Sequence, residues 1–209
     1  MQWHDYLEIL TAIIVIVDPL GAIPIFVSLT TDQSESERAH TARVAAISAC
    51  LVLMVASLVG ESVLHFFGIR VASFQVGGGI LILLLAISML NARLSPAKQT
   101  PEEAREAEHK ENVALVPLAI PLLAGPAAIT TIIIYAHRDE GWLFRFSLLS
   151  SILIVSLMVW VCLRLSIPLS RKLGRTGLNN FTRLMGLLLV AIAVEFIATG
   201  LLQLFPGLK

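Results

Sequence analysis

Two carboxylate side chains lie inside long apolar stretches of this sequence, where acidic residues are rare and usually functional. Asp18 stands about eleven residues into one stretch, directly before Pro19, and Glu195 lies at a similar depth in another. An ionised carboxylate within a bilayer is costly and commonly marks an ion or substrate pathway. Asp18 could serve in this way, or could cap a half-helix that begins at Pro19. Glu195 could titrate, pair with a cation, or be a neutral hydrogen-bonded acid.

A proline motif occurs twice. Residues 19–24 read Pro-Leu-Gly-Ala-Ile-Pro and residues 121–126 read Pro-Leu-Leu-Ala-Gly-Pro, so both contain Pro-Leu-x-Ala-x-Pro with a glycine inside. Proline lacks an amide N–H and its ring clashes with the preceding turn, so each motif predicts an opened helix. Freed backbone groups are tolerated in a membrane only where they pack in protein or line a wet cavity. The alternative is a pair of structural kinks, because proline and glycine are common in membrane helices.

From the two motifs we predict that both breaks, with Asp18, line one polar cavity near the bilayer midplane. Thr130 follows the second break and could bind a solute or its own helix, an alternative that stays open for Thr131 too. The predicted solute-binding residues are Asp18, Pro19, Gly21, Ala22, Ile23, Pro24, Pro121, Ala124, Gly125, Pro126 and Thr130.

The elements that carry these residues follow from composition. Of the 209 residues 56% are hydrophobic and 14% charged, and the mean hydropathy is +0.84, well above the range of soluble domains. A bilayer core needs about 20 apolar residues per helix. Two polar segments, Arg93–Asn112 and Arg171–Asn180, are predicted to be solvated loops. The predicted spans are Leu7–Leu29, Ala42–Phe66, Val71–Asn91, Val113–Ala136, Trp142–Leu169 and Arg183–Phe205. The sequence therefore predicts an all-α integral membrane protein with six transmembrane helices.

The halves of the chain resemble each other beyond the proline motif. Phe74-x4-Gly79-x-Leu81-x4-Ala86 matches Phe181-x4-Gly186-x-Leu188-x4-Ala193. This predicts one transmembrane domain over residues 1–209, with repeat one at about 1–92, a cytoplasmic loop at about 93–112 and repeat two at about 113–209. Three spans per half make the repeats inverted, each with a broken first helix. Interruptions at matching positions of inverted repeats point to a transporter's midplane site.

The distribution of basic residues predicts the orientation. Eleven of the 15 Lys and Arg residues fall on the side of the 93–112 loop, and the other side holds Arg70, Arg138, Arg145 and Lys209. The positive-inside rule makes the richer side cytoplasmic and places both termini outside. The first eight residues contain no Lys or Arg, so the first span is predicted to be retained rather than cleaved as a signal peptide.

Several classes of function find no support in the residues. Acidic and basic residues both number 15, which gives no reason to expect a nucleic acid partner. The two cysteines lie in apolar runs, and no catalytic signature of the Gly-x-Ser-x-Gly or His-Glu-x-x-His type is present. We expect no catalytic residue, metal or cofactor. Glu61 and Arg164 lie near span ends, where snorkelling or pairing at the interface is the simpler interpretation.

Several motifs spread over nearly the whole chain resemble those of the MarC family. They are Asp18–Pro24, Gly60-Glu61, Gly77–Gly79, Val116–Leu122, Ala124–Pro126 and Arg183–Leu187. The resemblance implies a six-span inner-membrane protein of bacteria or archaea. Some members are described as small neutral amino acid transporters.

The leading hypothesis is a secondary transporter for a small zwitterion such as glycine or alanine, embedded in the cell inner membrane. Half-helices present positive N-termini to a carboxylate and free carbonyls to an ammonium group. Coupling would be to H⁺ or Na⁺, with Asp18 as the first candidate and Glu195 as the second. The alternatives are an uncoupled channel-like or accessory membrane protein and, with less support, an intramembrane enzyme.

Overall fold

A computed structural model describes residues 3–91, 122–138 and 141–208 of the chain. All regular structure in these ranges is helical. The elements are α1 (Trp3–Val17), α2 (Ile23–Leu29), α3 (Glu35–Phe66), α4 (Val71–Leu90), α6 (Pro126–Arg138), α7 (Trp142–Arg164), α8 (Ser166–Leu204) and the short 3₁₀ helix η2 (Pro206–Leu208).

Four of the described helices are long and apolar enough to cross a membrane: Glu35–Phe66, Val71–Leu90, Trp142–Arg164 and Thr176–Leu204. Their outer faces carry large apolar side chains, as Ile47, Leu51 and Val55 do along α3. Such exposed apolar faces are expected where lipid is the solvent. The four helices correspond to the predicted second, third, fifth and sixth spans, and the prediction of an all-helical integral membrane protein is confirmed.

The two predicted spans that contain proline motifs are divided. The first consists of α1 and α2 with a non-helical link between them. The fourth is described from Leu122 onward, and its residues 113–121, with Pro121, lie outside the described residues, as does the predicted 93–112 loop.

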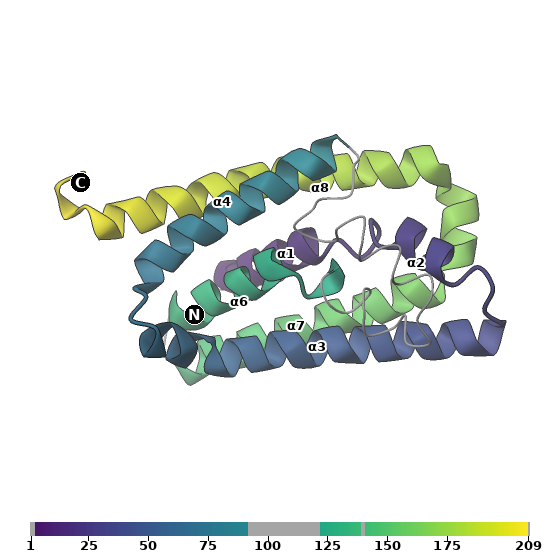
Figure 1. The fold of residues 1–209 in the computed structure, drawn as a ribbon, viewed down its shortest axis with the longest axis horizontal. Coiled ribbons are helices and arrows are strands. Elements are labelled where there is room, and N and C mark those ends of the chain that lie inside the picture. The colour runs from purple at the N-terminus through teal and green to yellow at the C-terminus, as the bar shows by residue number, and fades with distance from the viewer. Residues whose placement is uncertain (1–2, 92–121, 139–140, 209) are drawn as a thin grey trace.

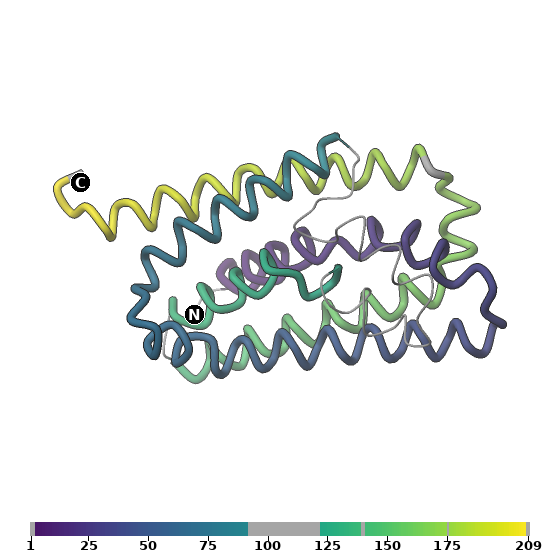
Figure 2. Tube along the Cα trace, viewed as in Figure 1, coloured from purple at the N-terminus to yellow at the C-terminus, as the bar shows by residue number. Residues whose placement is uncertain are grey.

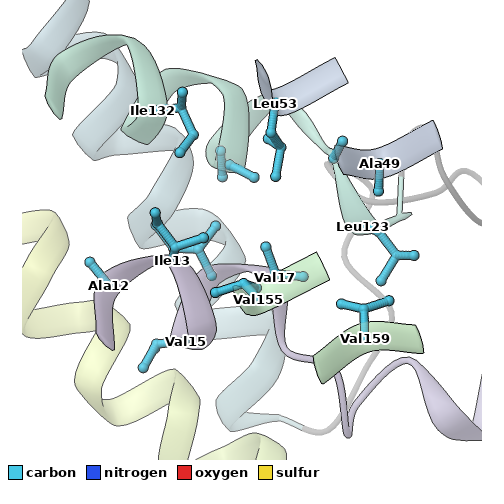
Figure 3. Packing of buried hydrophobic residues seen from close by; sticks show 14 of the residues in the cluster. Ala12, Ile13, Val15, Val17, Ala49, Leu53, Leu123, Ile132, Val155 and Val159 are labelled. Carbon is cyan, nitrogen blue, oxygen red and sulfur yellow. The ribbon is translucent and has the colours of Figure 1, made fainter. Parts of the chain in front are cut away.

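The helices form three groups (Figures 1 and 2). The α4 and α8 helices run antiparallel along one side, α3 and α7 pack along the other, and α1, α2 and α6 lie between them. Figure 3 shows Ile13 of α1 and Leu53 of α3 in the shared apolar core, with Ile132 of α6 and Val155 of α7. The central helices, which carry the proline motifs, are therefore enclosed by the longer ones.

Both ends of the chain lie at one end of the bundle (Figure 1). The α3–α4 turn at residues 67–70 lies there too, while the α2–α3 and α7–α8 connections lie at the opposite end. We call the first end the terminal end. Its identity as the outer side stays a prediction.

The second span begins earlier than predicted. Helix α3 starts at Glu35, not near Ala42, because Ser34 and Glu37 form a capping box. The Ser34 hydroxyl accepts from the Glu37 amide at 3.3 Å, and the Glu37 carboxylate accepts from the Ser34 amide at 2.8 Å. The box satisfies amides that the first turn leaves unpaired. At 1.5 Å per residue the helix is about 48 Å long, more than a bilayer core requires.

The prediction of a loop at Arg171–Asn180 is wrong. Helix α7 ends at Arg164, short of the predicted Leu169, and α8 begins at Ser166. Gly174 (φ 65°, ψ 173°) interrupts α8, a backbone conformation that glycine adopts without a steric penalty. The short helical piece before Gly174 carries exposed Arg171 and Lys172. The segment is polar, as its sequence indicates, but its backbone groups are paired within helices.

Glycines bring α4 and α8 close together. A Cβ atom added at Gly79 would lie 3.0 Å from the Ala193 carbonyl oxygen, and one at Gly186 would lie 3.1 Å from that of Ala86. Small residues allow this approach of helix backbones in membranes. Gly78 likewise meets Thr130 of α6, whereas Gly77 faces open space.

Candidate functional site

The first break is a turn built around Asp18. The Gly21 amide donates to the Asp18 carboxylate at 3.1 Å, and the Ala22 amide donates to the Asp18 carbonyl at 3.2 Å. Asp18 has a φ of 48°, in the left-handed region where Asp is one of the more tolerated residues. The expectation that the half-helix begins at Pro19 is wrong. Helix α2 begins at Ile23, with Pro24 in the first turn, where the missing amide has no intrahelical partner to lose.

The turn is packed against helix α8. Asp18 is 2% exposed, so its carboxylate faces protein rather than lipid. A Cβ atom at Gly21 would overlap the Asp18 carboxylate and lie 2.9 Å from the Thr182 hydroxyl oxygen. Position 21 therefore accepts no side chain without displacing the carboxylate or α8, and Thr182 becomes a further polar neighbour of the turn.

The second break has a related construction. Leu122 and Leu123 form a wide turn of π-helix, Ala124 and Gly125 are non-helical, and Pro126 opens α6. The Gly125 carbonyl accepts the first helical bond from the Ile129 amide at 3.0 Å. As in the first break, a proline stands in the first turn of the half-helix that follows.

The second break adjoins the end of α1 that leads into the first break. Ile16, two residues before Asp18, lines a cavity together with Leu122, Leu123 and Gly125. Its volume is about 10 Å³, the space of roughly one water molecule. The end of α1 thus lies close to the second break, and the space between them is too small for an amino acid.

The predicted binding residues divide by burial. Pro24 and Pro126 are exposed and Gly21 is half-buried, while Pro121 lies outside the described residues. Those that the structure buries around the two breaks are Asp18, Pro19, Ala22, Ile23, Ala124, Gly125 and Thr130. Their contact with a solute stays a prediction.

The two threonines after the second break differ. The Thr131 hydroxyl donates to the Ala127 carbonyl at 2.9 Å, which commits it to its own helix. Thr130 packs its methyl group against Gly78 of α4 and is 3% exposed. Of the pair, Thr130 alone stays a candidate for solute binding.

Glu195 does not join Asp18. It is exposed on α8, with the Thr199 hydroxyl at 3.5 Å. Thr182, which adjoins the Asp18 turn, precedes Glu195 by 13 residues, about 20 Å along a helix. The expectation of similar depth for the two carboxylates is therefore wrong, and Glu195 lies nearer the terminal end.

Charged residues at the helix ends form pairs between distant elements. Glu8 of α1 accepts from Arg138 of α6 at 2.6 Å, a pair that sequence reasoning did not find. The only available signal was an acid near the start of the first span and a base just after the fourth. Of the two alternatives for Glu61 and Arg164, snorkelling or pairing, the structure shows pairing. Glu61 Oε1 lies 2.7 Å from His137 Nδ1, and Arg164 lies 3.7 Å from Glu35.

No metal centre is evident within the described ranges. They contain no group of three or more His, Cys, Asp and Glu residues that could hold a metal ion. The chemistry these residues offer is binding of charged groups by backbone dipoles, buried hydroxyls and one buried carboxylate.

Comparison with known proteins gives a consistent result. A family model described as "MarC family integral membrane protein" matches residues 3–205. The UPF0056 membrane protein YhcE of Escherichia coli (strain K12) is 37% identical over 203 residues, covering 97% of this chain and 94% of its own length. The UPF0056 membrane protein MJ0972 of Methanocaldococcus jannaschii is 37% identical over 204 residues, covering 98% and 90%. No solved structure matches the chain.

Proposed function

This chain belongs to the MarC family of integral membrane proteins, and from that premise we propose that it is a secondary transporter of small neutral amino acids such as glycine and alanine. The solute site lies at the two helix breaks, and transport is coupled to H⁺ or Na⁺. The protein resides in the cell inner membrane with both termini outside.

The observation that carries the proposal is the pair of buried breaks, the second beside the end of α1 that leads into the first, with Asp18 in the first. Helix α6 begins at the second break, so its positive N-terminal end points at the junction and suits a carboxylate. Helix α1 ends at the first break, where carbonyl oxygens and the Asp18 carboxylate suit an ammonium group. An amino acid carries both charges.

The residues around the junction favour a small solute. Ala22 and Ala124 occupy equivalent positions of the two motifs and are 3% and 0% exposed. Larger side chains on the solute would meet the apolar core formed by Ile16, Leu122 and Leu123. The volume of about 10 Å³ at this point corresponds, under the proposal, to a closed carrier without solute.

Asp18 is the candidate for ion coupling. A carrier that uses an ion gradient needs a group whose charge or ligation changes during the cycle, and a buried carboxylate beside the solute site can serve. Glu195, which lies nearer the terminal end, is the second candidate. The alternative of an uncoupled channel or accessory protein requires no such group.

We also infer that the helices form two inverted three-helix repeats. Support comes from reciprocal contacts in the α4–α8 pair. A Cβ at Gly79 would meet the Ala193 carbonyl, whereas one at the equivalent Gly186 would meet the carbonyl of Ala86, which is the equivalent of Ala193. Exchanging the repeats leaves this contact unchanged, as a two-fold axis in the membrane plane requires.

Counterflow in proteoliposomes tests the function. Vesicles loaded with unlabelled glycine are diluted into a trace of labelled glycine, with protein-free vesicles as the control. A carrier produces transient accumulation of label that saturates with glycine and is inhibited by alanine but not by lysine. Flux that rises linearly with concentration would instead indicate a channel, and absence of glycine or alanine flux would remove the proposal.

A further inference from the structure

A second cavity lies at the terminal end, between α1, α6 and α8. We call it the terminal cavity. Its volume is about 770 Å³, and its lining includes Glu8, Val15, Tyr135, Arg138 and Glu195. A smaller cavity of about 170 Å³ between α4, α6 and α8 shares four of these residues, all except Val15. The charged side chains of Glu8, Arg138 and Glu195 therefore lie where the two cavities meet.

One guanidinium, that of Arg138, and two carboxylates, those of Glu8 and Glu195, line the terminal cavity together with His4. Arg138 Nη1 donates to Glu8 Oε1 at 2.6 Å, and both side chains remain about half exposed, at 51% and 41%. A guanidinium has five N–H donors in a planar fork that matches a carboxylate, so this pair leaves donors for a ligand. Glu195 lines the same hollow from α8.

Tyr135 holds the guanidinium in place. The Arg138 Cζ atom lies 6.0 Å from the Tyr135 ring centroid, within the range of a cation–π contact. The Tyr135 hydroxyl donates to Glu8 Oε1 at 3.5 Å, and the ring packs edge-on against Phe196. Because Tyr135 is buried, it fixes the position of both members of the ion pair.

This charge pattern suits a zwitterion better than an ion of either sign. A simple anion at Arg138 would face the Glu8 carboxylate that is paired with it, and a simple cation would face the guanidinium. A small amino acid can place its carboxylate on Arg138 and its ammonium group between Glu8 and Glu195. Each of its charged groups then meets an opposite charge.

The terminal cavity also reaches toward the helix breaks. Val15 lines it and precedes Asp18 by three residues, less than one helical turn and about 4.5 Å along the axis. We propose that the terminal cavity is a second binding site, in which Arg138, Glu8 and Glu195 capture a small zwitterionic amino acid before it passes to the breaks. This inference rests on the proposed transport function for its solute.

Equilibrium binding of labelled glycine to the purified protein tests the site, with Arg138→Gln as the variant. Arg145→Gln is the matched control, because Arg145 is exposed and lines a different hollow near the terminal end, with Glu61 and His65. A charge-assisted hydrogen bond contributes about 1.5–3 kcal/mol, so Arg138→Gln should weaken binding by about tenfold or more. Arg145→Gln should leave it unchanged.

A second measurement separates recognition from structural damage. Glycinamide lacks the carboxylate, so it should bind the wild type more weakly than glycine, and Arg138→Gln should bring the two affinities together. If Arg138 had only a structural role, Arg138→Gln would weaken the binding of glycine and of glycinamide equally. If Arg138→Gln does not fold, Arg138→Lys, which keeps the charge but not the planar fork, should reduce the same ratio.

The outcomes distinguish this inference from the proposed function. Glycine counterflow with binding that Arg138→Gln leaves intact would overturn the terminal site and keep the carrier. Binding that depends on Arg138 without any counterflow would keep the site and remove the carrier. Absence of saturable glycine binding would overturn the site.

Discussion

At the scale of single residues, Asp18 combines a buried carboxylate, a left-handed backbone and a place between two helical segments. The sequence allowed two roles for it, ion coupling and capping. The Gly21 amide on its carboxylate at 3.1 Å shows that it caps the turn of the break, not helix α2. The contact does not test the coupling role of Asp18, which stays a prediction. The prolines and the glycine of the motif indicated the break after α1. The start of α2 at Ile23 depends on tertiary packing, which the motif does not contain.

Replacing Asp18 tests whether the carboxylate does more than hold the turn. Asn tolerates the left-handed region and is itself a good cap, so Asp18→Asn should fold normally. If Asp18 couples the ion, gradient-driven glycine uptake should fall by about tenfold or more, the loss expected for one charged contact, and by a larger factor than glycine binding. Asp18→Ala is the control that also removes the cap. Normal gradient-driven uptake by Asp18→Asn would remove Asp18 from coupling.

At the scale of elements, apolar length and glycine spacing predicted the helices well, and polar segments were predicted poorly. The long helices follow from runs that must pair their backbone within lipid. The start of α3 depends on the Ser34–Glu37 capping box, and the helical course of residues 171–173 depends on Gly174 beyond them. The first is a local hydrogen-bonding arrangement and the second a local backbone conformation, and hydropathy registers neither of them. The Glu8–Arg138 pair joins residues 130 positions apart, and only the fold brings them together.

The α4–α8 contact can be tested by substituting two glycines of α4, one at the contact and one away from it. Gly79→Leu inserts a side chain where even an added Cβ atom would lie 3.0 Å from the Ala193 carbonyl oxygen. Overpacking of this kind costs about 1–3 kcal/mol. Gly77→Leu is the matched control, since nothing lies within 4 Å of a Cβ there and the gain in helix propensity is the same. Thermal unfolding in detergent should therefore show a lower midpoint for Gly79→Leu. Equal midpoints would contradict the close approach, and Gly186→Leu should resemble Gly79→Leu if the repeats are equivalent.

At the scale of the whole molecule, the two helix pairs α4–α8 and α3–α7 enclose the broken helices. The sequence predicted an all-helical membrane protein, which is confirmed, and two breaks, of which the structure describes the first in full and the second from Leu122 onward. It predicted a polar cavity at the two breaks and a similar depth for Glu195, whereas the fold leaves about 10 Å³ beside the second break and places Glu195 in the terminal cavity of about 770 Å³. The volume of a cavity depends on how helices pack, and spacing along the chain carries no information on it.

The orientation in the membrane is a separate prediction at this scale. Cysteine placed in the 93–112 loop, in a Cys50→Ser/Cys162→Ser background, should resist a membrane-impermeant thiol reagent applied to intact cells. Cysteine at Arg70, in the turn at the terminal end, should react. The prediction rests on the excess of basic residues on the loop side. The opposite labelling pattern would reverse the topology.

The central claim, that the two breaks hold a small amino acid, is tested most directly by filling the space between them. Ala22→Leu adds bulk at a buried position of the first break, and Ala198→Leu makes the same change at an exposed position of α8. Glycine counterflow should be abolished in Ala22→Leu and unchanged in Ala198→Leu, with thermal unfolding used to verify that both variants fold. Wild-type counterflow in a folded Ala22→Leu protein would contradict the claim.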